Sequence, residues 1–337
     1  MKLLLIYTGG TIGMIQSPDG DLSPFDFDEV IRQVPEIKQM DCEIDTIQAW
    51  NPLDSSDINH NHWIKLANIL NDNRSSYDSF VILHGTDTMA YTASALSFIL
   101  MNFSKPIILT GSQLPIGVLR SDGRENLITS IELAMTKRGD NTPAIQEICV
   151  YFEYKLFRGN RVFKRSSQAF EAFSSPNYPI LADVGVHIDI HEEYTLSPEK
   201  NYFFEPEMDS HIAVLKFFPG IDEAFLRNTI LNSGRNAIIL QTYGSGNVPK
   251  LDFLSDILDE ARDKGVLIIN TSQCPGGGVS QPAYAASRML RHSGVLSAGD
   301  MTLEATITKT IWLLGRGKQG KVFEQLFLEN LVGERTI

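Results

Sequence analysis

Positive charge is scarce in this chain. Its 337 residues include 29 Lys and Arg against 41 Asp and Glu, which gives a formal net charge of -12, and the basic residues form no run. Nucleic acids and anionic membrane surfaces attract basic patches, so this balance argues against both as partners. We therefore expect no nucleic-acid and no membrane binding.

Cysteine and long apolar runs are also in short supply. Cys42, Cys149 and Cys274 are odd in number and widely spaced, which favours a reducing compartment over a disulfide framework. The first apolar run, at residues 3–7, is too short for the apolar region of a signal peptide and far too short to span a membrane. The sequence predicts a cytoplasmic protein.

No metal or nucleotide cofactor is predicted. His60 and His62 lie two positions apart without a third ligand, and no Cys pair has metal-ligand spacing. The glycines at 8–13 and 244–246 do not form the dinucleotide-binding fingerprint with its acidic residue further along the chain.

What the chain does contain is a repeated alternation of short apolar runs and longer amphipathic stretches. A length of 337 residues with 43% hydrophobic residues predicts two domains. The alternation predicts an α/β fold, with a larger N-terminal, mostly parallel sheet that has helices on both faces. The expected strands are 3–7, 80–83, 106–109 and 148–152, and the expected helices are 61–71, 89–101 and 124–135.

A polar, Glu-rich stretch interrupts this pattern at 191–211 and is predicted to be a linker. It separates an N-terminal catalytic domain, 1–190, from a smaller C-terminal Rossmann- or flavodoxin-like α/β domain, 212–337. The second domain is expected to have strands at 212–216, 237–241 and 266–270, and helices at 221–231, 251–263 and 284–292.

Small polar residues follow the predicted strands. Open parallel sheets place their sites at the carboxyl ends of strands. The segment TGGTIG at 8–13 follows the first strand, and its glycines leave the hydroxyl of Thr11 uncovered, which makes Thr11 a candidate nucleophile. Further segments of this kind are HGTDT at 84–88, DSSD at 54–57 after an irregular 51–53, and TGSQ at 110–113.

These groups suit a small zwitterion. Hydroxyls and backbone amides would bind its carboxylate, and Asp87 would bind its ammonium through charge-assisted hydrogen bonds. Lys164 enters from the segment 158–164. If it reaches Thr86, a deprotonated amine there would serve as a base toward a Thr hydroxyl.

Each motif, taken alone, also has an ordinary structural explanation. A Gly-Gly turn after a first strand is more often a phosphate turn or plain structure than a nucleophile loop. Thr86 or Asp87 would cap the helix 89–101, the segment 54–57 would be a polar turn, and Lys164 would be a solvated surface charge.

Taken together, the motifs resemble bacterial L-asparaginases over nearly the whole chain. The closest likeness is to the cytoplasmic type I branch, in which Asp-Ser-Ser-Asp replaces a Ser-Gln pair. The segments that carry the resemblance are TGGTIG (8–13), DSSD (54–57), HGTDTMAYTA (84–93), TGSQ (110–113), RGNR (158–161) with Lys164, AF (172–173), SPN (175–177) and YGSGN (243–247).

The resemblance implies hydrolysis of the side-chain amide of L-asparagine to L-aspartate and ammonia through an acyl-threonine intermediate, without a cofactor. It implies Thr11 as the nucleophile and a second catalytic group of Thr86, Asp87 and Lys164. Since a glutamine is only one methylene longer, weak glutaminase activity is also expected. The implied substrate-binding residues are Gly10, Asp54, Ser55, Ser56, Gly85, Thr86, Asp87 and Ser112, with Gly10, Gly85 and Thr86 supplying backbone donors to an oxyanion.

Two departures from the family pattern stand out. The loop 14–24 lacks the Tyr that assists the family's nucleophile, and Asp21 takes its place, so a water, Lys164 or another Tyr would activate Thr11. Cys274 matches one residue of an allosteric asparagine site found in some type I enzymes. Phe163 and Gln241 stand where that site has a Thr and an Arg, so we expect no such regulation.

The resemblance also implies a homodimer or homotetramer. Two other functions remain open at this point. One is a related amidase, either a glutaminase-asparaginase or the amidotransferase subunit that releases ammonia for transfer-RNA modification. The other is an inactive module that keeps the amino-acid pocket, for which the missing Tyr is the best support.

Overall fold

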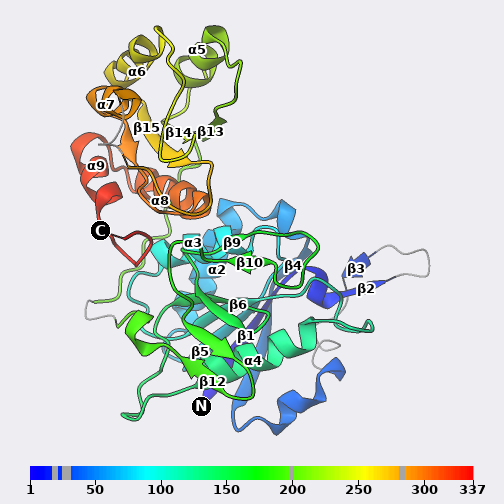
Figure 1. Ribbon diagram of the computed structural model, residues 1–337. Coiled ribbons are helices and arrows are strands. Elements are labelled where there is room, and N and C mark those ends of the chain that lie inside the picture. The colour runs from blue at the N-terminus through cyan, green and yellow to red at the C-terminus, as the bar shows by residue number, and fades with distance from the viewer. Residues whose placement is uncertain (17–21, 25–31, 198–200, 281–284, 337) are drawn as a thin grey trace. The chain divides into compact units, whose positions relative to one another are not determined.

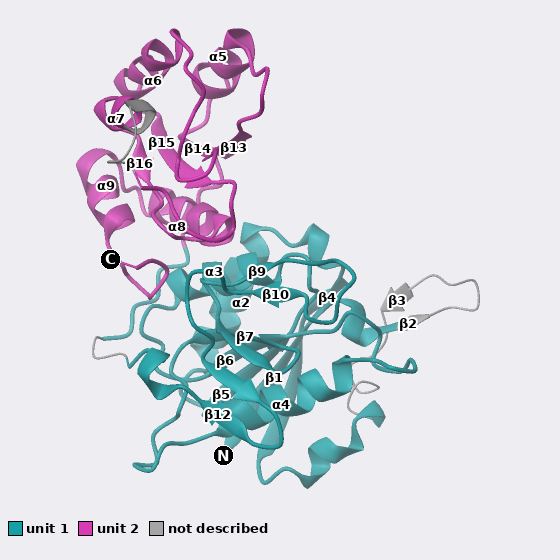
Figure 2. Ribbon diagram, viewed as in Figure 1, with its two compact units in different colours: residues 1–206 teal, residues 207–337 magenta. Residues whose placement is uncertain are grey.

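The computed structural model describes residues 1–16, 22–24, 32–197, 201–280 and 285–336 (Figure 1). It divides into two compact units, Met1–Pro206 and Glu207–Ile337 (Figure 2). The division lies inside the stretch 191–211 expected to be a linker. Among the described residues, no helix has the length and apolar character needed to cross a membrane.

An 8-stranded sheet forms the centre of the first unit, in the order β12-β11-β8-β7-β6-β5-β1-β4. The strands from β4 to β7 pair in parallel, and β8, β11 and β12 extend the sheet in antiparallel fashion. The bounds are β1 Lys2–Gly9, β4 Glu43–Leu53, β5 Ser79–Leu83, β6 Ile107–Thr110, β7 Ile148–Phe152, β8 Lys155–Arg158, β11 Ala182–Val184 and β12 Ile188–Ile190.

Helices cover both faces of this sheet. Leu3 and Leu5 of β1 share a buried cluster with Leu127 and Ile131 of α4. Side chains alternate along a strand, so Leu4 points to the opposite face, where it is equally buried and where α3 packs on β6 and β7 and against α2. The helices are α2 His60–Asn73, α3 Met89–Ile99 and α4 Gly123–Met135. The predicted mostly parallel α/β sheet is confirmed.

One sequence interpretation was wrong. Residues 51–53, expected to be irregular, belong to β4, whose Leu53 pairs with Gly9 across a register shift. Pro52 is tolerated because β4 lies at the edge of the sheet, where no other described strand lies on its outer side to receive an N–H. The extension of β4 brings residues 54–57 beside the end of β1.

Short elements complete the first unit. β2 and β3 form an antiparallel hairpin within the loop 14–24. Residues 17–21 of this loop, including Asp21, lie outside the described residues. The other short pairing, β9 with β10, is also antiparallel. The bounds are η1 Thr11–Gly13, β2 Met14–Gln16, β3 Leu22–Pro24, η2 Pro35–Gln39, η3 Ser55–Asp57, β9 Phe163–Lys164, β10 Phe173–Ser174 and η4 Glu192–Tyr194.

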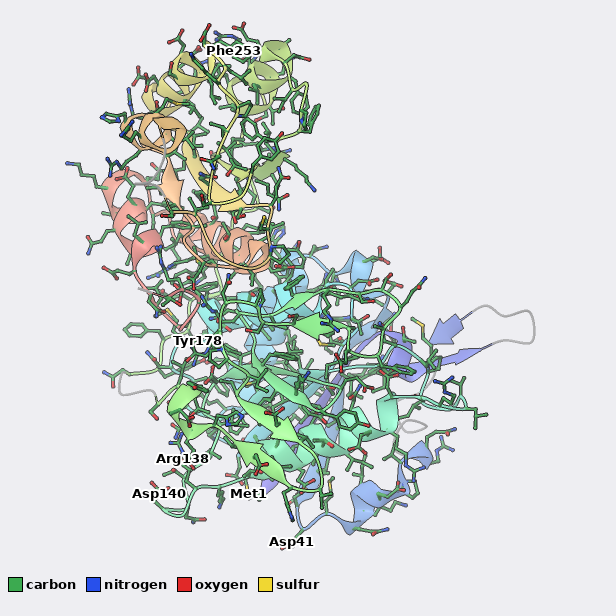
Figure 3. The ribbon with its side chains drawn as sticks, in the orientation of Figure 1. Met1, Asp41, Arg138, Asp140, Tyr178 and Phe253 are labelled. Carbon is green, nitrogen blue, oxygen red and sulfur yellow. The ribbon has the colours of Figure 1, made fainter. Side chains whose placement is uncertain are left out.

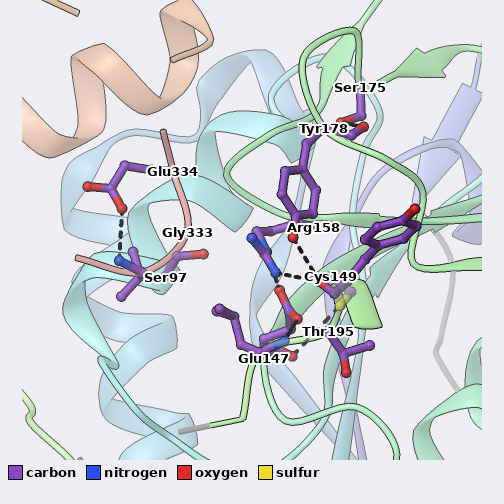
Figure 4. Close-up of polar contacts among 12 residues, drawn as sticks. Ser97, Glu147, Cys149, Arg158, Ser175, Tyr178, Thr195, Gly333 and Glu334 are labelled. Atoms are coloured by element: carbon purple, nitrogen blue, oxygen red, sulfur yellow. Dashed lines mark hydrogen bonds and ion pairs between the residues drawn. The ribbon is translucent and has the colours of Figure 1, made fainter. Parts of the chain in front are cut away.

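A buried ion pair joins Glu147, just before β7, to Arg158 at the end of β8. Arg158 Nε donates to Glu147 Oε2 at 2.7 Å, and Glu147 Oε1 accepts from Leu196 N at 2.6 Å (Figure 4). The guanidinium of Arg158 lies 4.2 Å from the ring centroid of Tyr178, which is also labelled in Figure 3. Because the side chains of Arg158 and Glu147 are only 4% and 5% exposed, this part of the RGNR segment belongs to the interior of the first unit.

The second unit has a parallel sheet in the order β13-β14-β15-β16. Its first three strands and first three helices follow the predicted alternation, whereas the short strand β16 and the two helices after it were not predicted. The bounds are β13 Ile212–Lys216, α5 Glu223–Leu231, β14 Ala237–Thr242, α6 Leu254–Asp263, β15 Leu267–Ser272, α7 Ala285–His292, β16 Leu296–Ser297, α8 Leu303–Gly315 and α9 Gly320–Leu328.

Candidate functional site

The loops after β1 and β5 meet backbone to backbone, and the Ser55 side chain from the loop after β4 packs against them. A Cβ atom on Gly10 would lie 2.4 Å from Gly85 N, and one on Gly85 would lie 2.6 Å from Ser55 Oγ. Gly10 also has a φ of 88°, which side chains disfavour. Glycine is therefore required at both positions, and it allows three strand ends to converge.

Thr11 begins η1 directly after this contact and is half-buried. Within the described residues its hydroxyl makes no hydrogen bond. The residues after it are held firmly, because Tyr7 Oη donates to Gly13 O at 3.2 Å and Ile116 N donates to Ile12 O at 3.3 Å. The turn therefore presents an uncommitted hydroxyl on a fixed backbone, as a nucleophile requires.

The predicted second group comes together. Lys164 Nζ donates to Thr86 Oγ1 at 2.7 Å and to Asp87 Oδ1 at 2.6 Å. The Lys164 side chain is 16% exposed and that of Asp87 61%, so the interpretation of Lys164 as a solvated surface charge was wrong. β9 supplies Lys164 through its pairing with Phe173 of β10.

Helix capping does not account for the Thr-Asp pair. The N-cap of α3 is Thr88, and no side chain caps that helix. The Thr88 hydroxyl donates instead to Ser55 O at 2.7 Å, while Thr86 and Asp87 both contact Lys164. Their side chains are thus directed to the cluster and not to the helix.

Gln113 is a neighbour of Thr86 that the sequence analysis did not single out. Thr86 Oγ1 lies 3.4 Å from Gln113 Oε1, and Gln113 Nε2 donates to Ala169 O at 2.9 Å. The signal was present in the sequence, because Gln113 belongs to the TGSQ segment that follows a strand. Its side chain links the end of β6 to the segment that follows Lys164.

The DSSD segment divides into structural and accessible parts. Asp54 Oδ1 accepts from Ser56 N at 2.8 Å and so caps η3, as the polar-turn explanation predicts. Ser55 is 3% exposed and faces Gly85, and Ser56 is exposed. Of the four residues, Ser55 is the one that lies against the loop of Thr86.

Ser112 is buried, and its hydroxyl donates to Leu114 O at 2.5 Å. The Asp122 carboxylate accepts from Gln113 N at 2.9 Å and from Leu114 N at 3.1 Å. Burial raises the pKa of Asp122, although these backbone hydrogen bonds act in the opposite direction. Because the Ser112 hydroxyl is engaged, the backbone of this residue is the part left to contact a ligand.

The backbone donors differ in availability. Gly10 N donates to Leu53 O at 3.1 Å, so the expectation that it is a free oxyanion donor was wrong. The extension of β4 to Leu53 is the physical reason, since it supplies the acceptor. The N–H groups of Gly85 and Thr86 donate no hydrogen bond within the described part of the chain.

His62 and His84 have structural partners. His62 Nδ1 accepts from Asn59 N at 3.2 Å as part of a capping box, and its ring lies 5.0 Å from that of Trp50. His84 is buried, and burial lowers its pKa to about 4. Among the described residues, no group of three His, Cys, Asp or Glu side chains is arranged to hold a metal.

The YGSGN segment lies in the second unit, after β14. Thr242 Oγ1 donates to Asn270 Oδ1 at 2.7 Å, and Asn270 Nδ2 donates to Gly246 O at 3.2 Å. Gln241 O accepts from Gln273 Nε2 at 2.9 Å, and Cys274 is exposed. The segment is thus a fixed loop at the carboxyl end of its own strand.

Comparison with known proteins agrees with this geometry. The family model described as "Asparaginase, N-terminal" matches residues 2–196, and "Glutaminase/Asparaginase C-terminal domain" matches residues 211–327. A protein named L-asparaginase 1 from Escherichia coli is 39% identical over 338 residues, which cover 99% of this chain and 98% of that protein.

Solved structures give the same result. L-asparaginase I from Vibrio cholerae has 36% identity and a TM-score of 0.90, covering 100% of this chain and 99% of that one. The thermostable L-asparaginase from Thermococcus kodakarensis has 32% identity and a TM-score of 0.89, with the same coverage. The chain therefore belongs to the asparaginase family, which confirms the resemblance carried by its motifs.

Proposed function

We propose that this protein is an L-asparaginase that hydrolyses L-asparagine to L-aspartate and ammonia. The observation that carries the proposal is the contact of Lys164 with Thr86 and Asp87. These two residues stand on the loop after β5, which contacts the turn bearing Thr11. Family membership and the similarity to proteins named L-asparaginase support the same substrate.

The reaction proceeds in two halves. Thr11 Oγ1 attacks the side-chain amide carbon, the C–N bond breaks, and ammonia leaves with the proton of the Thr11 hydroxyl. A water then attacks the acyl carbon, the bond to Thr11 breaks, and Thr11 regains its proton as L-aspartate leaves. Thr86 holds the attacking water, and Lys164, which donates directly to Thr86 Oγ1 at 2.7 Å, orients that hydroxyl.

Charge complementarity positions the substrate. Asp87, 61% exposed, accepts from the substrate ammonium, and Ser55 and Ser56 with the Ser112 backbone bind the substrate carboxylate. The free N–H groups of Gly85 and Thr86 face developing negative charge on the amide oxygen. Glutamine fits the same contacts with one more methylene, so a weak glutaminase activity accompanies the main one.

We also propose a homodimer or homotetramer in the cytoplasm. The family resemblance supports the oligomer. Three free cysteines, Cys42, Cys149 and Cys274, support a reducing compartment. Size-exclusion chromatography with light scattering at several protein concentrations measures the oligomer directly.

Ammonia release from L-asparagine and L-glutamine by wild type and Thr11→Ala tests the function. We expect asparagine turnover in wild type, none in the variant, and a hyperbolic dependence on asparagine concentration. A well-folded wild type that binds L-aspartate yet releases no ammonia would favour an amino-acid-binding module instead. The loss of activity would then be explained by the missing Tyr in the loop 14–24.

A further inference from the structure

A chain of buried hydrogen bonds runs from the helices to the loop of Thr86. Trp63 Nε1 of α2 donates to Thr92 Oγ1 of α3 at 3.1 Å, and Thr92 Oγ1 lies 2.8 Å from His84 Nε2. At the other side of the ring, His84 Nδ1 lies 2.7 Å from Gly85 O. His84 is 1% exposed and Thr92 0%, so water does not compete for these bonds.

The partners determine which ring nitrogen of His84 carries the proton. Gly85 O is a carbonyl and accepts only, so Nδ1 is protonated and donates to it. The ring is neutral, because burial lowers its pKa to about 4, and Nε2 is then an acceptor. Thr92 donates its hydroxyl proton to Nε2 and accepts from Trp63, which satisfies every member of the chain.

The bond to Gly85 O also sets the direction of the next N–H group. The peptide between Gly85 and Thr86 is trans, and in a planar trans peptide the C=O and the N–H point in opposite directions. Since Gly85 O points at the His84 ring, Thr86 N–H points away from it. That N–H has no acceptor within the described part of the chain, so it is available to a ligand.

We propose that His84 is a positioning residue, which fixes the Gly85–Thr86 peptide so that Thr86 N–H faces the negative charge that develops on the substrate amide oxygen. Thr92 and Trp63 fix His84 in turn. The proposal rests on the proposed asparaginase activity, and it assigns to His84 no contact with the substrate.

Kinetics of His84→Asn and His84→Leu test it. The side-chain amide of Asn places a donor near the position of Nδ1, and Leu has a similar shape without one. We expect kcat for asparagine to fall about 10- to 100-fold in His84→Leu, less than the loss on deleting an oxyanion donor, with KM nearly unchanged. We expect His84→Asn to recover most of that loss.

A second pair of variants separates positioning from general destabilisation. Thr92→Val removes the hydroxyl that holds Nε2, and it should lower kcat in the same direction with little change in KM. Thr129→Val is the matched control, since Thr129 is also buried and its hydroxyl donates to Glu125 Oε1 on α4. It should keep the wild-type kcat. Calorimetric titration with L-aspartate should give wild-type affinity in all four variants.

The outcomes distinguish this inference from the function on which it rests. An active wild type, an inactive Thr11→Ala and an unimpaired His84→Leu would overturn the role of His84 and leave the asparaginase in place. Equal losses in His84→Leu and His84→Asn, or a matching rise in KM, would also overturn it. A wild type without asparagine turnover would overturn both proposals.

Discussion

Lys164 Nζ lies 2.7 Å from Thr86 Oγ1 although the two residues are 78 positions apart in the sequence. The ammonium contacts Asp87 with the same nitrogen, at 2.6 Å. A hydroxyl, an amine and a carboxylate thus share one cluster at the carboxyl end of β5. This arrangement leads to predictions about turnover, substrate affinity and stability.

Lys164→Met should lower kcat for asparagine about 10²- to 10⁴-fold, the range in which a positioned acid or base contributes. The variant keeps the methylene stem of the side chain and loses the amine that contacts Thr86. Lys250→Met, at an exposed position of the second unit, is the control and should keep the wild-type rate. Steady-state ammonia release measures both, and equal rates for the two variants would remove Lys164 from the mechanism.

Thr86→Val should separate the two halves of the reaction. Val keeps the shape of Thr and lacks the hydroxyl that lies near Lys164, so attack by water is impaired while acylation of Thr11 continues. We expect an initial burst of ammonia followed by slow turnover. Mass spectrometry of the intact protein should detect an aspartyl adduct in Thr86→Val and none in the double variant with Thr11→Ala; an adduct in the double variant would contradict Thr11 as nucleophile.

Asp87→Asn should mainly weaken substrate binding. A hydrogen bond to a charged group contributes about 1.5–3 kcal/mol, so loss of the carboxylate should raise KM for asparagine about tenfold to a hundredfold. Calorimetric titration with L-aspartate should show a matching loss of affinity. Asp140→Asn, in an exposed turn, serves as the control. Unchanged affinity in Asp87→Asn would contradict the assignment of Asp87 to the substrate ammonium.

The buried His84 should make stability dependent on pH. Burial lowers its pKa from 6.5 to about 4, so between these values the unfolded chain binds a proton that the folded chain excludes. The free energy of unfolding should therefore be unaffected by His84 above pH 6.5 and should fall as the pH drops toward 4, by about 3 kcal/mol in total. Urea unfolding across this range should show a shallower dependence on pH in His84→Asn; equal slopes would contradict a neutral His84.

Glu147→Gln should destabilise the first unit by about 3–5 kcal/mol, because it leaves the buried Arg158 without its charge partner. Glu171→Gln breaks an ion pair of similar length between Arg165 and Glu171. The side chains of these two residues are 48% and 57% exposed. It should cost at most about 1 kcal/mol. Thermal unfolding of both variants measures the difference, and similar midpoints would show that burial of the Arg158 pair contributes little.

The alternation of strands and helices could be predicted from the sequence alone, and so could the position of the polar residues after strands. Short apolar runs such as residues 3–7 and 80–83 predict strands that are buried on both faces, because their side chains are apolar on both sides of the strand. The motifs also marked Gly10 and Gly85 as special positions. The structure gives the reason, because a Cβ atom at either position would clash with the neighbouring loop. Thr11, Thr86, Asp87 and Lys164 were identified at this level.

The hydrogen-bond partner of each polar group, in contrast, depends on the folded chain. Nothing in the local sequence shows that β4 extends through Pro52 and thereby engages Gly10 N, or that Gln113 faces Thr86. The partner of His84 Nε2 is likewise a hydroxyl from another element, Thr92 of α3. Hydrogen bonds are directional and short, so they are set by contacts between segments that lie far apart in the sequence, whereas hydrophobic patterning is local and can be read from it directly.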